Sequence, residues 1–296
     1  MKKFFENLKR IVLYFVKRLS PKLYEVLSTQ LNKRLIKGSF WSILGGVVYK
    51  ALMLLSSIIV ARLIAKSEFG EYGLIRSTIS MFAAFAGFGI GMTSTKYIAQ
   101  YKKISKERTG RFIGITTLFG VFTSLLIVVV INIMAPYLAK ETLNAPHLEM
   151  ELRLASLILL FTTLSGIQSG ILVGFESFKT IAKINFIGGA LAFPIQISLT
   201  YLYGLKGAII GYGSVFFISW LLYITAVTRE TEKSNIKIDY RNSFKEWKIL
   251  YQFSLPAFFA SLLFSGVHWT SNVILVNSEN GYLEMAFYEA ANQWRI

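Results

Sequence analysis

The residues best suited to chemistry in this chain are basic side chains inside apolar stretches. Lys50 lies about 12 residues into the stretch 39–65, roughly 16 Å from its start and close to the midplane of a hydrocarbon core about 30 Å thick. An ionisable side chain at that depth is costly and usually faces an interior cavity or a charged partner. Lys50 is therefore predicted to contact an anion in a central cavity. The alternative is a lysine that pairs with a neighbouring helix or reaches towards water.

Four more polar residues are weaker candidates for the same cavity. Arg62 and Arg76 are expected near the outer ends of the first two apolar stretches, where basic side chains commonly extend to the interface. They are second candidates for the anion contact. His268 and Asn272 lie in the middle of the stretch 250–276. A buried, hydrogen-bonded histidine is expected there more than a proton relay.

Other kinds of chemistry lack the residues that they need. The sequence has no cysteine and only two histidines, which excludes a cysteine–zinc site, a thiol nucleophile and a histidine-rich metal site. Apart from Glu151, the first residue of the predicted span 151–173, no Asp or Glu falls inside the predicted spans given below, and paired aspartates for a metal–nucleotide-sugar site do not exist. No catalytic residue, metal, cofactor or enzyme activity is therefore predicted. Basic residues without acidic ones favour an anionic cargo such as a lipid pyrophosphate.

Membrane-spanning helices must position these residues. The chain is 54% hydrophobic and 16% charged, with a mean hydropathy of +0.51, whereas about a quarter of the residues in a soluble chain are charged. The charges are clustered and leave seven stretches that approach or exceed the roughly 18 to 20 residues of a spanning helix. These stretches are 39–65, 72–100, 113–135, 151–173, 184–203, 207–227 and 250–276. The predicted fold class is an all-α polytopic membrane protein.

The positive charges indicate the orientation. Most of the 32 Lys and Arg fall in the segments 1–38, 101–112, 174–183 and 228–249, which the positive-inside rule places in the cytoplasm together with the N-terminus. The net charge of +16 then faces the cytosol and anionic headgroups, and nucleic acid is not an expected partner. Residues 1–38 have the pattern of a basic amphipathic helix on the cytoplasmic membrane surface, although a poorly ordered basic tail is the alternative.

The remaining chain divides into three expected parts. Residues 39–227 form a six-helix lobe, 228–249 a cytoplasmic loop, and 250–296 the seventh helix with part of an eighth. A short internal repeat supports a second, related lobe. Phe-Gly-Glu-Tyr-Gly-Leu at 69–74 and Tyr-Leu-Glu-Met-Ala-Phe at 282–287 share the pattern aromatic, any, Glu, any, small, apolar. Transporters are often built from such duplicated halves, and we expect the sequence to stop inside the second one.

Several segments, in order, resemble the polysaccharide and O-antigen flippase family of the multidrug/oligosaccharidyl-lipid/polysaccharide (MOP) exporter superfamily. Ala-Arg-Leu-Ile at 61–64 and Glu-Phe-Gly-Glu-Tyr-Gly at 68–73 are similar to its signature after the first helix. Further similar segments are 87–89, 96–99, 174–179, 255–257, 280–282 and 290–295. The resemblance covers roughly 38–296 and implies a MATE-like fold of two six-helix lobes around a cavity that opens alternately to each face.

The resemblance also implies a cargo. This would be an undecaprenyl-pyrophosphate-linked oligosaccharide, moved across a bacterial inner membrane for surface polysaccharide, O-antigen and lipopolysaccharide synthesis. Lys50 would hold the pyrophosphate, with Arg62 and Arg76 behind it. Anionic lipids at the N-terminal segment, and polysaccharide polymerase or chain-length proteins, are further candidate partners. The alternatives are a multidrug or peptidoglycan-precursor exporter of the same superfamily and, from a different class, a membrane-embedded polymerase or acyltransferase.

Overall fold

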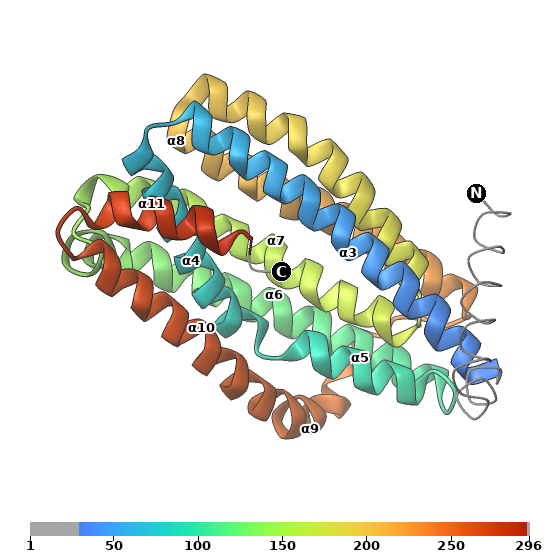
Figure 1. The fold of residues 1–296 in the computed structure, drawn as a ribbon. Helices are drawn as coiled ribbons and strands as arrows, with labels where there is room; N and C mark the ends of the chain where they lie inside the picture. Colours follow the sequence, from blue (N-terminus) through green and yellow to red (C-terminus); the bar gives the residue numbers. More distant parts are fainter. Residues whose placement is uncertain (1–29, 295–296) are drawn as a thin grey trace, which may run out of the picture.

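The computed structural model describes residues 30–294, and this part of the chain is helical and without strands (Figure 1). The α-helices are α3 (Gln30–Leu63), α4 (Lys66–Gly87), α5 (Ile90–Tyr101), α6 (Lys106–Tyr137), α7 (Glu149–Gly174), α8 (Phe178–Lys233), α9 (Trp247–Ile249), α10 (Leu255–Val276) and α11 (Gly281–Asn292). Most of the predicted amphipathic segment 1–38 lies outside the described residues. Its last residues belong to α3, which begins before the predicted boundary.

The helices match the seven predicted spans when α4 and α5 are counted as one bent span and α8 is counted as two. Five helical segments are long and apolar enough to cross a membrane, and α4 with α5 forms a sixth span that bends by 42°. The bend lies at Phe88 and Gly89, which both have positive φ. The 56-residue α8 reverses at Gly204 (φ 55°, ψ −133°), and its two halves are joined by a 3.0 Å hydrogen bond from Tyr223 to Asn185. The chain is therefore a multi-pass membrane protein.

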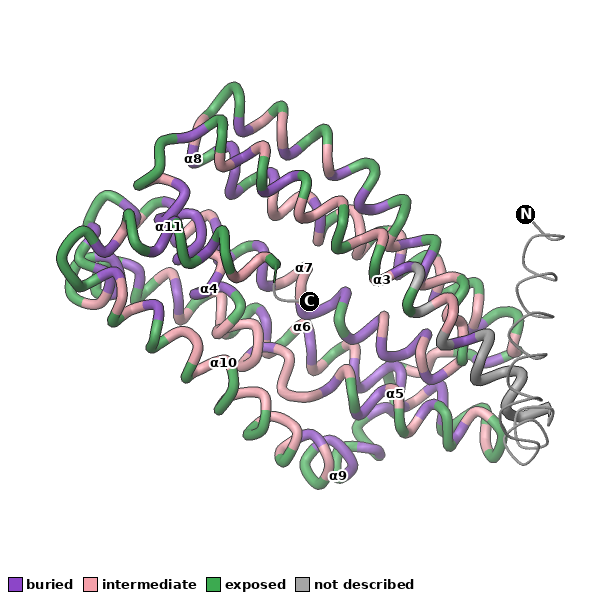
Figure 2. Tube along the Cα trace, in the orientation of Figure 1, coloured by how far each residue is buried: buried purple, intermediate pink, exposed green. Residues whose placement is uncertain are grey.

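The helices pack around α7 and α4. Helix α3 lies along α8, and α7 contacts α5, α6 and α8 from the middle of the bundle (Figure 1). Helix α4 packs against α10 and α11. Buried positions concentrate on α7 and α4, whereas α10 and α6 leave many residues exposed (Figure 2). On α6 the exposed side chains include Phe122, Leu126 and Ile133, and an apolar exposed face of this kind is typical of a helix that contacts lipid.

Small residues bring α5 and α7 into close contact. A Cβ atom on Gly170 would overlap the backbone of Gly91, and one on Gly174 would lie within 2.8 Å of the Ile98 side chain. The Thr95 hydroxyl donates a 3.1 Å hydrogen bond to the Gly170 carbonyl. Glycine contacts with interhelical hydrogen bonds are the usual means of packing helices in a membrane. These contacts hold α5, the helix that follows the bend, against α7.

The segment between the two predicted lobes is an ordered loop. Its backbone at Lys237 and Asp239 lies directly against Gly110 and Gly114 of α6. The Glu246 carboxylate forms ion pairs with Arg108 at 3.1 Å and with Arg111 at 3.2 Å. Hydrogen bonds from the backbone and side chain of Asn242 lower the pKa of the Asp239 carboxyl. The 234–246 loop is therefore attached to α6.

Candidate functional site

The central feature of the site is an ion pair between α4 and α11. Nη1 of Arg76 donates to Oε1 of Glu289 over 2.7 Å, and Glu289 is 7% exposed. The guanidinium carbon also lies 5.4 Å from the ring centroid of Tyr72 and 4.9 Å from that of Tyr212 on α8. Because aromatic faces attract cations, three helices contribute to holding one positive charge.

A buried hydrogen-bonded chain supports the Tyr72 side of this pair. Ser56 of α3 donates to Oε1 of Gln196 on α8 over 2.7 Å, and Nε2 of Gln196 donates to the Tyr72 hydroxyl over 2.9 Å. Ser56, Gln196 and Tyr72 are each at most 2% exposed. Their polar groups have partners, as burial requires, and the chain fixes the ring on which Arg76 rests.

A second set of polar contacts joins α4 to α10. Asn272 donates to the Ser77 hydroxyl at 2.7 Å, and the indole nitrogen of Trp269 donates to Thr78 at 3.0 Å. His268 lies between Asn272 and Asn292, at 3.5 Å from each amide nitrogen. The polar residues of α10 therefore face the same side of α4 as Glu289 of α11.

Two polar atoms at this site are buried without a hydrogen-bond partner. They are Nε of Arg76 and Oδ1 of Asn272. Leaving such groups unpaired costs roughly 1–3 kcal/mol each, so natural structures rarely contain them without a reason. One is a donor and the other an acceptor. The site therefore holds one donor and one acceptor that no described residue satisfies.

The five candidate residues from the sequence divide into two groups. Arg76, His268 and Asn272 gather where α4, α10 and α11 meet. Lys50 is exposed on α3 and makes no ion pair or hydrogen bond with another described residue, and Arg62 is exposed at the end of α3. The sequence suggested that Arg76 lies near the outer end of its span, but the structure places it inside α4. Helix α4 begins at Lys66, which places Arg76 roughly 15 Å along it.

Sequence reasoning missed the acidic partner. Glu289 belongs to α11, which lies beyond the last predicted span, 250–276. Helix α4 also starts earlier than expected and carries the buried Glu71, which lies 2.9 Å from Nε2 of His147. The internal repeat holds the signal that identifies Glu289, because Arg76 and Glu289 are separated by 213 residues, the spacing between Phe69 and Tyr282.

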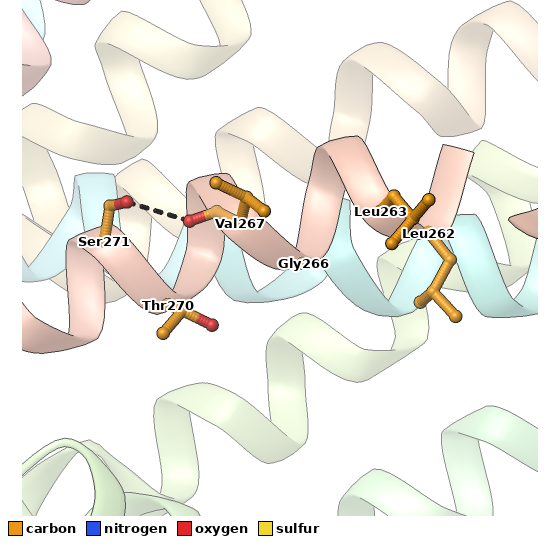
Figure 3. A pocket seen from close by; sticks show the side chains of 6 residues that line it. All are labelled: Leu262, Leu263, Gly266, Val267, Thr270 and Ser271. Carbon is orange, nitrogen blue, oxygen red and sulfur yellow. Dashed lines mark hydrogen bonds between the residues drawn. The ribbon is translucent and has the colours of Figure 1, made fainter. Parts of the chain in front are cut away.

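Two hollows lie elsewhere on the described residues. One of about 400 Å³ runs along the outer face of α10. Figure 3 shows that residues of the single helix α10 line it, among them Leu262, Leu263 and Val267. The Ser271 hydroxyl donates a 2.9 Å hydrogen bond to the Val267 carbonyl of the same helix. The other, of about 250 Å³, lies at the bend between α4 and α5 and also touches α7 and α10. Neither is lined by Arg76.

Solved structures with a similar fold are transporters. A eukaryotic MATE transporter superposes with a TM-score of 0.62 at 14% identity, over 88% of this chain and 63% of its own. An outward-facing multidrug resistance MATE transporter of the MOP superfamily gives 0.61 at 17%, over 88% and 62%. A MOP superfamily transporter from Pyrococcus furiosus gives 0.60 at 18%, over 89% and 65%. The chain thus spans less than two thirds of their length.

The family of the chain is established by its sequence, independently of these structural likenesses. No curated protein sequence matches the chain. The pattern of the family described as polysaccharide biosynthesis protein matches residues 35–296, which is most of the chain and includes each helix of the site. The structural likenesses establish the fold, and the family match covers the ion pair and its neighbours. The chain belongs to the polysaccharide biosynthesis protein family and has the fold of MOP superfamily transporters.

Proposed function

We propose that this protein moves an undecaprenyl-pyrophosphate-linked oligosaccharide across a bacterial inner membrane for surface polysaccharide or O-antigen synthesis. The observation that carries the proposal is the half-buried guanidinium of Arg76, at the junction of α4, α8 and α11. A planar guanidinium suits the oxygens of a phosphate group, to which it can donate two parallel hydrogen bonds. The family's association with polysaccharide biosynthesis supports a glycan as the attached group.

The surroundings of Arg76 suit the rest of such a cargo. Asn272, Asn292 and Gln293 add amide groups, which both donate and accept hydrogen bonds as sugar hydroxyls do. The mechanism would be alternating access between two lobes, with the cytoplasmic side at the basic segments 101–112 and 228–249. Lys50 and Arg62, exposed on α3, would guide the anionic head group towards Arg76 by long-range attraction.

The competing proposal is a multidrug exporter, and one observation favours it. Glu289 is a buried carboxylate, which is the kind of group expected in a cation-coupled transporter. However, Arg76 lies 2.7 Å from it and balances its charge. The site as a whole is therefore not negative, and this favours an anionic cargo over a cationic drug.

The test is complementation of a strain that lacks the gene. The strain should lose surface glycan and accumulate the lipid-linked precursor in the inner membrane. Wild-type protein should restore the glycan, whereas Arg76→Ala should restore less than a tenth, because removing a charge-assisted contact of about 1.5–3 kcal/mol costs roughly tenfold or more. The matched control is Arg153→Ala, which removes an arginine from a surface pair with Glu149 and should restore the glycan fully.

Other outcomes contradict the proposal. If the deletion strain keeps its surface glycan and becomes sensitive to cationic drugs, the exporter alternative holds. Lys50→Ala tests the lysine separately at matched expression. Full restoration by that variant removes Lys50 from the cargo path and leaves the role of Arg76 intact.

A further inference from the structure

Arg76 and Glu289 occupy matching positions of the internal repeat. They are 213 residues apart, as are Phe69 and Tyr282, which open the two copies of the repeated pattern. A Cβ atom on Gly70 would touch Tyr282 and Ala286, and one on Gly73 would touch Glu289. The contacts thus advance along α4 and α11 in the same direction. Two parallel, related helices that meet at matching positions bring equivalent residues together at a local two-fold axis.

Opposite charges at that axis have a specific consequence. Two identical ionised residues at matching positions would repel each other, whereas arginine in one copy and glutamate in the other attract. Gly70 and Gly73 allow the two backbones to approach closely at the same place. The ion pair therefore fastens α11 to α4 across the meeting point of the two repeats.

The hydrogen bonds of Arg76 are only partly used in this pair. Glu289 takes Nη1, and Nε is buried without a partner, so the carboxylate does not engage the guanidinium in the two-point geometry that arginine favours. An unneutralised guanidinium would be costly in the membrane. Glu289 thus supplies the negative charge that Arg76 requires when no other anion is present.

We infer that Glu289 is a built-in competitor for the pyrophosphate group of the cargo. This inference rests on the proposed function. The pyrophosphate takes over the guanidinium of Arg76, including the free Nε, and displaces the Glu289 carboxylate. The displaced carboxylate keeps a neighbour on its own helix, since Nε2 of Gln293 lies 3.4 Å from Oε1. Loss of the ion pair then releases α11 from α4, and cargo binding opens the contact between the repeats.

The test uses a single cysteine, which is straightforward because the chain has none of its own. Ala286→Cys places it in the α4–α11 contact, where residue 286 is 8% exposed. The protein is reconstituted in phosphatidylcholine nanodiscs and labelled with a maleimide. Geranylgeranyl pyrophosphate should raise the labelling rate roughly tenfold, within the range of typical coupling between linked sites. Geranylgeraniol, which lacks the pyrophosphate, should leave it unchanged.

Variants of the pair make the test specific. Glu289→Gln should raise the basal labelling rate and tighten geranylgeranyl pyrophosphate binding roughly tenfold, whereas Arg76→Gln should raise the rate and abolish binding. The swap Arg76→Glu with Glu289→Arg should bring the rate most of the way back, because the pair reforms without the two tyrosine rings behind the cation. Glu149→Gln, which removes an exposed carboxylate from an ion pair of similar length, should change neither quantity.

Two results would overturn the inference. One is labelling that responds neither to geranylgeranyl pyrophosphate nor to Glu289→Gln, in protein whose melting temperature shows that it is folded. The other is an equal response to added phosphatidylglycerol, which would mean that Arg76 binds the phosphate of bulk lipid. Either result leaves the proposed function standing if the deletion strain loses its surface glycan. A retained glycan with responsive labelling would refute the function and keep the competition.

Discussion

Gln196 and Tyr72 are joined by a 2.9 Å hydrogen bond from the amide nitrogen of Gln196 to the phenol oxygen. This bond connects α8 to α4 beneath the guanidinium of Arg76, whose charge rests against the Tyr72 ring. The other end of the Gln196 amide is bonded to Ser56. A single buried side chain therefore determines how α3, α4 and α8 support the ion pair.

Replacing Gln196 with leucine should destabilise the protein. The substitution leaves the Ser56 and Tyr72 hydroxyls buried without these partners, at a cost of roughly 1–3 kcal/mol for each unpaired group. The melting temperature in detergent, followed by tryptophan fluorescence, measures the effect. Gln168→Leu is the control, because Gln168 is also buried but its Oε1 already has no partner. An equal loss in both variants would contradict the role given to Gln196.

Adding one methyl group should have opposite effects at two helical glycines. Gly70→Ala puts a Cβ against the Tyr282 carbonyl, and overpacking of this kind costs about 1–3 kcal/mol. Gly46→Ala, within α3, meets no atom within 4 Å. It should stabilise the protein by roughly 0.5–1 kcal/mol, since alanine loses less chain entropy in a helix. Thermal unfolding of the two variants gives the sign of each change, and a stabilised Gly70→Ala would refute the close α4–α11 contact.

Gly204→Ala should destabilise the turn in α8 for a different reason. No atom lies within 4 Å of the added Cβ, but the backbone has φ 55° and ψ −133°, a conformation that costs a non-glycine residue about 1–3 kcal/mol. Gly266→Ala is the matched control, because its site is equally open and lies within the regular helix α10. A lower melting temperature for Gly204→Ala alone would identify backbone strain as the cause.

Removing Glu246 should loosen the 234–246 loop. Glu246 is 5% exposed and is the partner of both Arg108 and Arg111, and loss of such charged hydrogen bonds costs on the order of 1.5–3 kcal/mol. Hydrogen exchange of the loop amides should speed up in Glu246→Ala. Glu230→Ala removes only a 3.7 Å contact with the exposed Lys233 and should leave exchange in the loop unchanged. Unaltered exchange in both variants would mean that the glycine contacts alone hold the loop.

The spans could be predicted because a membrane leaves a simple pattern in a sequence. Long apolar stretches with few charges identified the spanning helices of the described residues, including both halves of α8 on either side of Gly204. The bend at Phe88 and Gly89 was less accessible. It depends on two consecutive left-handed residues, and Phe88 has no local preference for that conformation.

The site was harder to predict because it depends on which helices meet. Depth along the chain favoured Lys50, which lies exposed on α3, over Arg76. Only the packing of α4 against α8 and α11 brings Tyr212 and Glu289 to Arg76. Hydropathy cannot supply such pairings, since it scores each segment by itself. The repeat contained part of the answer, because its spacing equals the separation of Arg76 and Glu289.

The attachment of the 234–246 loop to α6 shortens the tether between the two repeats. A linker from the end of α8 to the start of α10 would, if free, allow wide relative displacement, because the reach of a flexible chain grows with its length. Glu246 and the backbone at Asp239 fasten most of it to α6. Only the helical turns from Trp247 to Ser254 remain as a connection. A short, helical connection of this kind gives α10 less freedom to move relative to the N-terminal end of α6 than a free linker would.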